Sequence, residues 1–283
     1  MTVTEKNGTD RNKLLLVNDL AGYGKVALSA MLPILSHMGF ELFTLPTALV
    51  SNTLDYGKFE ILDTKDYIRE TLRIWQELGF SFDAVATGFL ASDDEAELLA
   101  VFCAAERKRG TLIFVDPVLG DDGSLYHGIG EAAVENRKKL LSVADIIKPN
   151  YTEACLLTGS AYDETGISRA DGETLLRKLC AAGKSSVVIT SVPVREADGK
   201  KCCLGYDREN RQSFCLPYEE IKVRFPGTGD IFSSILLGDL LRGEKLEAAT
   251  ARAMRLVRAM IAANADRADK YRGIPVECYL GEI

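Results

Sequence analysis

The 283-residue sequence has little histidine and no paired-cysteine motif. Its two histidines, His37 and His127, lie far apart, and none of its seven cysteines are spaced as C-x-x-C. Both features argue against a zinc site, which usually takes closely spaced cysteine and histidine ligands. An odd number of cysteines in a long chain favours reduced thiols, so we expect a cytoplasmic protein. The adjacent pair Cys202 and Cys203 is given no role.

The sequence also lacks an excess of basic charge and any long apolar run. Its 34 lysines and arginines face 41 aspartates and glutamates, for a net charge of −7. Proteins that bind nucleic acid usually present a basic face, so a nucleic-acid partner is not expected. The apolar run after the polar start is too short for a signal peptide or a membrane span. We expect no membrane association, and a flexible extension over residues 1–12.

Short apolar runs alternate with longer runs of helical period. The expected strands are 13–18, 41–46, 83–89, 111–116, 144–149 and 185–190, and helices are expected at about 26–38, 63–79 and 92–110. This alternation predicts a parallel sheet covered by helices on both faces. Residues 201–217 resemble instead a late antiparallel hairpin turning at 207–210. We predict one α/β domain over residues 1–283, with ligands at the carboxyl ends of the strands.

Several residues are typical of helix starts. Asp63 or Thr64 is expected to cap the helix of 63–79, whose apolar face would be Tyr67, Ile68, Leu72, Trp75 and Leu78. Ser92 and Glu95 have the spacing of a capping box, as do Asn150 and Glu153.

The loop after the first strand allows an alternative function. Gly22, Gly24 and Ala27 fit the pattern G-x-G-x-x-A, with Glu41 near the distance of a ribose-binding acid. This pattern favours an NAD(P)-binding oxidoreductase. However, three residues separate the strand from Gly22, and Glu41 begins the second strand rather than ending it.

Two strand ends carry carboxylates. Asp116, Asp121 and Asp122 follow the strand of 111–116. They indicate either a site for a hard metal ion or a solvated Asp/Gly turn.

The segment "PGTGDIF" (226–232) places Gly227, Thr228 and Gly229 before an apolar helix. Backbone amides at a helix start favour an anion. The negative charge of Asp230 would repel a bound anion. The carboxylate is useful there if it takes a proton from a nucleophile that attacks the anion. The segment therefore predicts phosphoryl transfer, the alternative being a carboxylate that only favours the helix dipole.

These motifs together resemble the pyridoxal (pyridoxine, pyridoxamine) kinases of the ribokinase-like superfamily. The resemblance rests on "FVDPVLGDDGSLY", "ADIIKPNYTEACLLTG", "VVITS" and "PGTGDIF", in the family's order. It implies a three-layer αβα sandwich and ATP-dependent phosphorylation of the 5′-hydroxymethyl group of a B6 vitamer. It also implies a homodimer, Mg²⁺ with ATP, and often a monovalent cation such as K⁺ or Na⁺.

The resemblance also implies roles for individual residues. Asp230 would be the catalytic base, and Gly227, Thr228 and Gly229 the anion hole. Asp116 and Glu153 would hold the metal. The implied ATP-binding residues are Asp121, Tyr126, Lys148, Asn150, Glu153, Thr190 and Ser191, and the implied substrate-binding residues are Asp19, Tyr23, Ser51, Phe89 and Asp230.

The substrate side departs from the family pattern. Asp19 stands where the family has serine, Leu54 where it has threonine and Phe89 where it has tyrosine, and Lys148 replaces a usual threonine. Asp19 could pair with a protonated pyridine nitrogen or with the ammonium group of pyridoxamine. The preferred vitamer therefore stays open.

Other functions compete with a B6 kinase. A hydroxymethylpyrimidine kinase shares the fold and the reaction type, but its family typically has cysteine at the position of Asp230. A sugar kinase would usually have an extra lid and an N-terminal glycine pair. A non-catalytic vitamer-binding regulator would be expected to lose the base.

Overall fold

Nine strands form one sheet in the computed structural model, which describes residues 12–126, 129–183 and 185–283. The strand order is β11-β10-β9-β8-β5-β4-β1-β2-β3. The strands are β1 (Lys13–Ala21), β2 (Glu41–Val50), β3 (Ile61–Asp63), β4 (Ala84–Thr87), β5 (Leu112–Val115), β8 (Ile146–Ile147), β9 (Ser186–Pro193), β10 (Lys201–Asp207) and β11 (Gln212–Tyr218). Six neighbouring strands of the sheet pair in parallel: β2, β1, β4, β5, β8 and β9. Strand β3 at one edge and strands β10 and β11 at the other are antiparallel to their neighbours.

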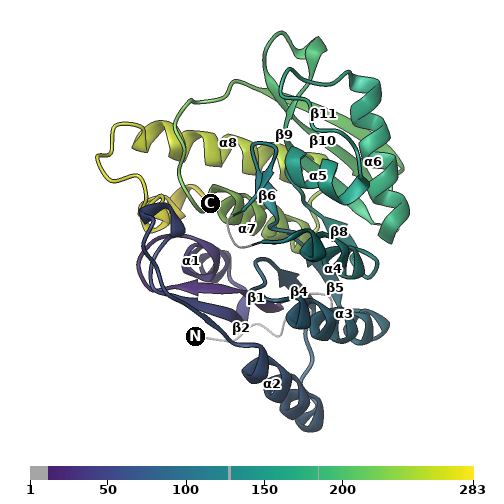
Figure 1. Ribbon diagram of the computed structural model, residues 1–283, viewed down its shortest axis with the longest axis vertical. Helices are drawn as coiled ribbons and strands as arrows, with labels where there is room; N and C mark the ends of the chain where they lie inside the picture. Colours follow the sequence, from purple (N-terminus) through teal and green to yellow (C-terminus); the bar gives the residue numbers. More distant parts are fainter. Residues whose placement is uncertain (1–11, 127–128, 184) are drawn as a thin grey trace, which may run out of the picture.

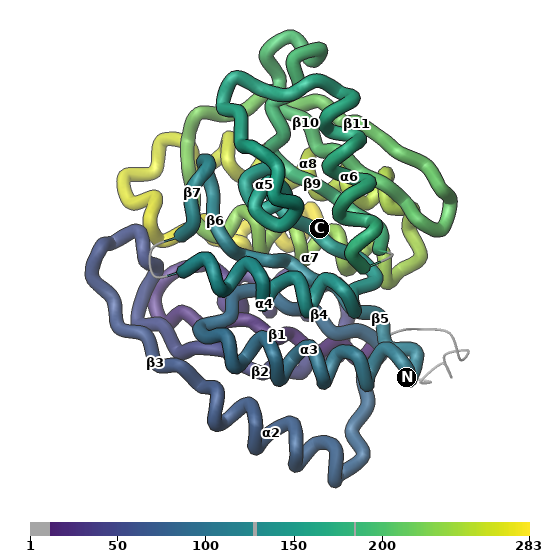
Figure 2. Tube along the Cα trace, turned by 45° about the vertical axis from the view of Figure 1, so that its right-hand side comes forward, coloured from purple at the N-terminus to yellow at the C-terminus, as the bar shows by residue number. Residues whose placement is uncertain are grey.

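Helices cover both faces of the sheet (Figure 1). One layer contains α1 (Ala27–His37), α7 (Thr228–Leu241) and α8 (Leu246–Asn264). The other contains α2 (Lys65–Leu78), α3 (Asp93–Lys108), α4 (Glu131–Leu141), α5 (Tyr151–Thr158) and α6 (Arg169–Gly183). Figure 2 shows α3 and α4 in front of the central strands. The expected three-layer α/β fold is confirmed.

Strand β1 shows why the chain forms three layers. Successive side chains of a strand point to opposite faces. Leu15 and Val17 therefore pack against the α2–α6 layer, whereas Leu14 and Leu16 pack against α1, α7 and α8. All four are almost completely buried, and burying such a side chain contributes about 1.5–3 kcal/mol.

The expected strands and the late hairpin are confirmed, and two further pairings appear. The three-residue strand β3 extends the far edge of the sheet, and β6 (Gly120–Asp121) with β7 (Ser124–Leu125) forms a separate small hairpin. The shorter elements are 3-10 turns at Leu54–Tyr56, Arg195–Ala197, Val276–Cys278 and Leu280–Glu282. No helix among the described residues is long and apolar enough to cross a membrane.

Two local predictions are wrong. On α2 Ile68 is buried and Leu72 and Trp75 are half-buried against the core, as predicted. Tyr67 and Leu78 are instead exposed, because the helix packs at the edge of its layer. The Ser92 side chain caps no amide, since Glu95 accepts a hydrogen bond from Ala91 N instead. By contrast, the second predicted capping box, in α5, is present in full. Of the expected extension over residues 1–12, all but residue 12 lies outside the described residues.

Candidate active site

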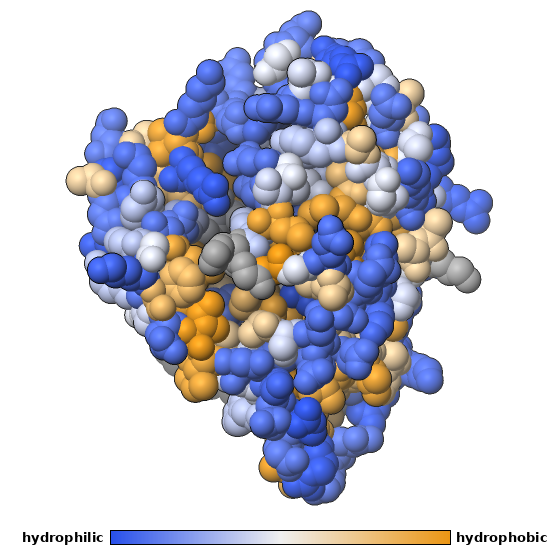
Figure 3. Space-filling view, viewed as in Figure 1, coloured by the Kyte–Doolittle hydropathy of each residue, from blue (hydrophilic) through white to orange (hydrophobic). Residues whose placement is uncertain are grey.

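A cleft of about 650 Å³ opens at the carboxyl ends of the central strands. Its floor is formed by the ends of β5, β8 and β9 and by the first turn of α7, and its walls by the β6–β7 hairpin, residues 219–226 and part of α8. Figure 3 shows a hollow on this face of the molecule, beside the region where the β6–β7 hairpin lies in Figure 1. The cleft lies where a parallel sheet is expected to bind its ligand.

The N-terminus of α7 points into this cleft. Gly227 is its N-cap, and no side chain of the described residues caps the amides of the first turn. Gly227 has φ +82°, and a Cβ atom built on it would lie 2.1 Å from the carbonyl oxygen of Lys25. Glycine is therefore required both for the backbone conformation and for the close approach. The result is a helix start with free amides that can receive an anion.

Asp230 lies in the first turn of α7 and is held by two donors. Its Oδ2 accepts a hydrogen bond from Ala27 N at 2.8 Å, and its Oδ1 accepts one from Asn18 Nδ2 at 3.3 Å. Burial raises the pKa of Asp230 to about 6, and the charge of Asp116 adds to the shift, although the donors and Lys148 oppose it. A carboxylate with this pKa is ionised at neutral pH and can accept a proton.

Asn18, which the sequence did not single out, connects the two sides of the site. This buried side chain of β1 donates to Asp230, and its Oδ1 accepts hydrogen bonds from the backbone N–H groups of Asp19 and Phe89 at 3.0 and 2.8 Å. The available signal was an asparagine inside an otherwise apolar strand, since a buried amide needs partners.

Asp116, at the end of β5, is paired with Lys148. Lys148 Nζ lies 2.6 Å from Asp116 Oδ2, and Ser233 Oγ of α7 donates to the same oxygen at 2.8 Å. Asp116 Oδ1 accepts no hydrogen bond from the described residues. One carboxylate oxygen is thus fixed by the protein, and the other is left for a ligand.

Glu153 is held at the start of α5. Its Oε2 accepts a hydrogen bond from Asn150 N at 2.8 Å, and its Oε1 accepts one from Leu119 N at 2.9 Å. Asn150 caps the helix and also donates from Nδ2 to the carbonyl oxygen of Gly120 at 2.7 Å. Burial and the charge of Asp116 raise the pKa of Glu153, against the opposing charge of Lys148. The capping box is therefore also the link between α5 and the β6–β7 hairpin.

The remaining predicted nucleotide residues line the same cleft. Asp121 belongs to β6, Tyr126 follows β7, and Thr190 and Ser191 lie on β9. Burial and the neighbouring Asp122 raise the pKa of Asp121. The structure thus brings together every residue that the resemblance assigned to ATP, the anion hole and the metal. These residues are Asp116, Asp121, Tyr126, Lys148, Asn150, Glu153, Thr190, Ser191, Gly227, Thr228, Gly229 and Asp230.

The predicted substrate residues lie on the other side of Asp230, at the ends of β1, β2 and β4. Tyr23 N donates to the carbonyl oxygen of Ser51 at 3.1 Å, and Phe89 is tied to β1 by Asn18. Asp19 is buried, and its carboxylate accepts no hydrogen bond from the described residues. Burial, together with the charge of Asp230, raises its pKa to about 7. Asp230 is the one predicted substrate residue that also lines the cleft.

Comparison with known proteins places the chain in a family. A family model described as phosphomethylpyrimidine kinase matches residues 30–274. The chain belongs to this family. A similar solved structure is a provisionally named phosphomethylpyrimidine kinase of Bacteroides thetaiotaomicron, crystallised with pyridoxal. The two chains are 34% identical and superpose with a TM-score of 0.90, over 96% of this chain and 95% of that chain.

Two relatives are named as B6 kinases. The pyridoxal kinase of Lactobacillus plantarum is 29% identical, with 96% of each chain covered and a TM-score of 0.85. The pyridoxine/pyridoxal/pyridoxamine kinase of Bordetella avium is 31% identical, with 84% of this chain and 81% of that protein covered. The predicted resemblance to pyridoxal kinases is confirmed.

The geometry of the loop between β1 and α1 excludes the dinucleotide-binding alternative. In that alternative a pyrophosphate would approach the N-terminus of α1. Here the carboxylate of Asp230 occupies this position through its bond to Ala27 N. Glu41, the candidate ribose acid, lies at the amino end of β2, away from the ligand edge of the sheet.

The acidic side chains fit Mg²⁺ bound together with ATP. The described residues contain no group of three or more His, Cys, Asp or Glu side chains able to hold a metal by themselves. Mg²⁺ on a nucleotide needs only one or two protein carboxylates, because phosphates and waters complete its shell. Asp116 Oδ1 and Asp121 Oδ2 are available for this purpose. Asp121 Oδ1 accepts a hydrogen bond from Asp122 N, and both oxygens of Glu153 already accept backbone amides.

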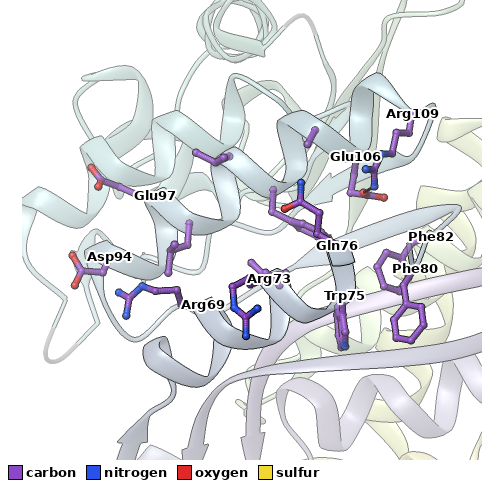
Figure 4. A pocket seen from close by; sticks show the side chains of 15 residues that line it. Arg69, Arg73, Trp75, Gln76, Phe80, Phe82, Asp94, Glu97, Glu106 and Arg109 are labelled. Atoms are coloured by element: carbon purple, nitrogen blue, oxygen red, sulfur yellow. Dashed lines mark hydrogen bonds and ion pairs between the residues drawn. The ribbon is translucent and has the colours of Figure 1, made fainter. Parts of the chain in front are cut away.

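A second groove, of about 590 Å³, lies between α2 and α3 (Figure 4). Trp75, Phe80 and Phe82 lie together at one end of it, and Asp94 and Glu97 lie at the other end. It lies on the outer helical layer and brings together none of the predicted site residues.

Proposed function

We propose that this chain is a pyridoxal kinase, which transfers the γ-phosphoryl group of ATP to the 5′-hydroxymethyl group of a B6 vitamer. The observation that carries this proposal is the carboxylate of Asp230 beside the free amides of the α7 N-terminus. A base next to an anion site suits an alcohol that attacks a phosphoryl group.

The reaction follows from this arrangement. The amides of Gly227, Thr228 and Gly229 receive the transferred phosphoryl group, and the hydroxyl oxygen of the vitamer attacks its phosphorus. The bond from phosphorus to the leaving oxygen of ADP breaks, and the proton of the hydroxyl group passes to Asp230. Asn18 and Ala27 N orient the carboxylate toward that proton. Correct positioning of the two reactants supplies much of the rate.

The nucleotide side holds ATP and its metal. Asp116 and Glu153 would hold Mg²⁺, directly or through water, and Mg²⁺ supplies neutralisation of the phosphate charges when bound. The supporting geometry is the open Oδ1 of Asp116 and the placement of Glu153 beside it. The other ATP contacts proposed are Asp121, Tyr126, Lys148, Asn150, Thr190 and Ser191, all of which line the cleft.

The substrate side holds the pyridine ring. Tyr23, Ser51 and Phe89 would surround it, with Asp19 as its charged partner. Burial of Asp19 disfavours the charged form of its carboxylate, and a cation that reaches the carboxylate offsets this cost. A pyridinium N–H or an ammonium group on the vitamer meets this need, so Asp19 would favour the protonated ring or pyridoxamine.

A cytoplasmic homodimer of single-domain subunits completes the proposal. It is supported by seven free cysteines and by the resemblance to pyridoxal kinases. Sedimentation of the purified protein would measure the subunit number.

The second candidate is a hydroxymethylpyrimidine kinase, favoured by the description of the matching family model. Both substrates offer a hydroxymethyl group on a nitrogen heterocycle. A coupled assay of ADP release with pyridoxal, pyridoxamine, pyridoxine and hydroxymethylpyrimidine separates them. We expect turnover with a B6 vitamer and much less with the pyrimidine. The reverse order would reject the proposal, and no turnover with any of the four would reject both candidates.

A further inference from the structure

Lys148 is a buried lysine at the centre of the cleft. It is 5% exposed, although lysine side chains almost always reach solvent unless they are paired. The other basic side chains that line the cleft reach solvent at its rim, and they are Lys201, Lys222, Arg224 and Arg258. Among the cleft-lining residues, Lys148 is therefore the cation placed at the floor.

The ammonium group of Lys148 lies between the carboxylates and the anion hole. It contacts Asp116 Oδ2 at 2.6 Å, and a Cβ atom built on Gly229 would lie 3.6 Å from its Nζ. A lysine that served only to neutralise Asp116 would not need to approach Gly229. This approach places the positive charge beside the amides that receive the phosphoryl group.

The carboxylates around Lys148 suit a fixed positive charge. Its ammonium group pairs with Asp116, and the carboxylates of Glu153 and Asp230 belong to the same cleft.

We infer that Lys148 is a built-in cation for the transferred phosphoryl group and takes the place of a free K⁺ or Na⁺ ion at this site. This inference rests on the proposed kinase function. A monovalent cation would be attracted to the same carboxylates, but the ammonium group already balances Asp116. The residues therefore do not fit the monovalent ion that the resemblance implies, and turnover is independent of such ions.

The role of the ammonium group in the reaction is electrostatic. As the bond to ADP breaks, negative charge spreads over the oxygens of the phosphoryl group. A fixed charge in a site shielded from water stabilises this state without reorganisation. A lysine acts here as a point charge rather than as a bidentate donor.

The test compares two variants of Lys148 with a rim control. Lys148→Ala removes the ammonium group and leaves space for an ion, and Lys148→Gln keeps a donor for Asp116 without the charge. Lys201→Ala removes a cation from the rim of the cleft. Turnover is measured with rising KCl at constant ionic strength, balanced by tetramethylammonium chloride, and thermal stability is recorded for every protein.

We expect wild-type turnover to be unaffected by K⁺. Lys148→Ala should lose about 10²–10³-fold in kcat, the loss typical of one group that stabilises developing charge, and should regain part of it with K⁺. Lys201→Ala should show no response to K⁺. A wild-type protein that requires K⁺, or a Lys148→Ala variant with near wild-type turnover, would overturn the inference.

A binding measurement serves if the alanine variant does not fold. Fluoroaluminate with MgADP imitates the phosphoryl group in transfer, whereas MgADP alone does not. For Lys148→Gln we expect a much larger loss of affinity for MgADP with fluoroaluminate than for MgADP. An equal loss of affinity for MgADP with and without fluoroaluminate would show that Lys148 is only a counter-ion of Asp116. Because this readout needs no vitamer, it tests Lys148 even if the proposed substrate class is wrong.

Discussion

The two sides of the site treat their carboxylates differently. On the nucleotide side, Asp116 is paired with Lys148 and Ser233, and Glu153 accepts two backbone amides. On the vitamer side, Asp19 is buried beside Asp230 with no donor from the described residues on its carboxylate. The carboxylates of Asp116 and Glu153 are thus held by an ion pair and hydrogen bonds within the protein, whereas the carboxylate of Asp19 is left for the ligand.

This difference corresponds to two kinds of recognition: the nucleotide side binds the phosphates of ATP, and the vitamer side distinguishes between vitamers. Any ATP-dependent kinase must hold the same phosphates, and the fixed network on the nucleotide side does so at little cost in ordering. Discrimination between vitamers needs a group whose energy depends on the ligand's charge. An unpaired carboxylate is such a group, because a neutral ligand leaves it unsatisfied.

The largest effect is expected at Asp230, which both sides share. Asp230→Asn keeps the size of the side chain but cannot accept the proton, so kcat should fall about 10²–10⁴-fold. This loss corresponds to ~3 to 5 kcal/mol of barrier. The affinity for ATP should be equal or better, because a negative charge near the phosphates is removed. Near wild-type turnover would show that Asp230 is only a helix-start carboxylate.

The pH profile provides a second measurement of the same role. Only ionised Asp230 can act as a base, and burial raises its pKa to about 6. In the wild type, kcat/KM should therefore decline as the pH falls through about 6, and the Asn variant should lack this decline. Because Asp19 titrates nearby, the observed value belongs to the coupled pair. An acidic limb retained in Asp230→Asn would assign the titration to another group.

A smaller effect is expected from Glu153→Gln, which tests the nucleotide side. The apparent affinity for Mg²⁺ at fixed ATP should fall about 10–100-fold, the range usual for groups that support a metal. The matched control is Glu95→Gln, since Glu95 is also buried and also accepts a backbone amide, but outside the cleft. Both variants should lose some stability. If only stability changes in Glu153→Gln, the residue is a helix cap.

Asp19→Ser tests the vitamer side and should change kcat/KM by about tenfold between vitamers, equivalent to ~1.4 kcal/mol. The loss should be greatest for the vitamer with the most positive charge, with the KM for ATP little changed. Asp55→Ser removes an exposed carboxylate from the neighbouring 3-10 turn and serves as the control. Equal losses for all vitamers, or a loss confined to ATP, would contradict the assignment.

The last prediction concerns the stability of the folded protein. The pKa of Asp19 rises from 3.8 in a model peptide to about 7 in the folded protein. The folded state therefore binds more protons than the unfolded state between these values, and stability is lost as the pH rises through them. Asp19→Asn removes this loss, so its stabilising effect should be larger at pH 8 than at pH 4, with an upper bound of ~4 kcal/mol. Thermal unfolding at the two pH values measures it, and an equal effect at both would show that Asp19 is not perturbed.

The sequence predicted the layers and the nucleotide side well because both depend on local patterns. Strand and helix periods determine which residues are buried, and the Asn150–Glu153 capping box is complete within four residues. The same spacing failed at Ser92, where Glu95 turned to Ala91 N instead. A capping pattern indicates which hydrogen bonds are possible at a helix start. The packing around the helix start determines which backbone N–H group donates to the carboxylate.

Contacts across long distances in the sequence could not be predicted. Asn18 and Asp230 are 212 positions apart, and nothing in the segment around Asn18 indicates that its amide will orient a base. The small β6–β7 hairpin has only two residues in each strand, too few for a period to appear. The sequence shows only that Lys148 replaces a usual threonine, and its burial against Asp116 depends on contacts between separate strand ends.

The bond from Ala27 N to Asp230 gives the protein an internal spectroscopic reporter. The chemical shift of an amide proton follows the charge of its acceptor, so the Ala27 signal should move when Asp230 gains or loses a proton. A nuclear magnetic resonance titration of that single amide would read the state of the base in the resting enzyme, without turnover and without a label on the carboxylate. The same signal, followed during addition of a vitamer or a nucleotide, would show which ligand changes the charge at the base.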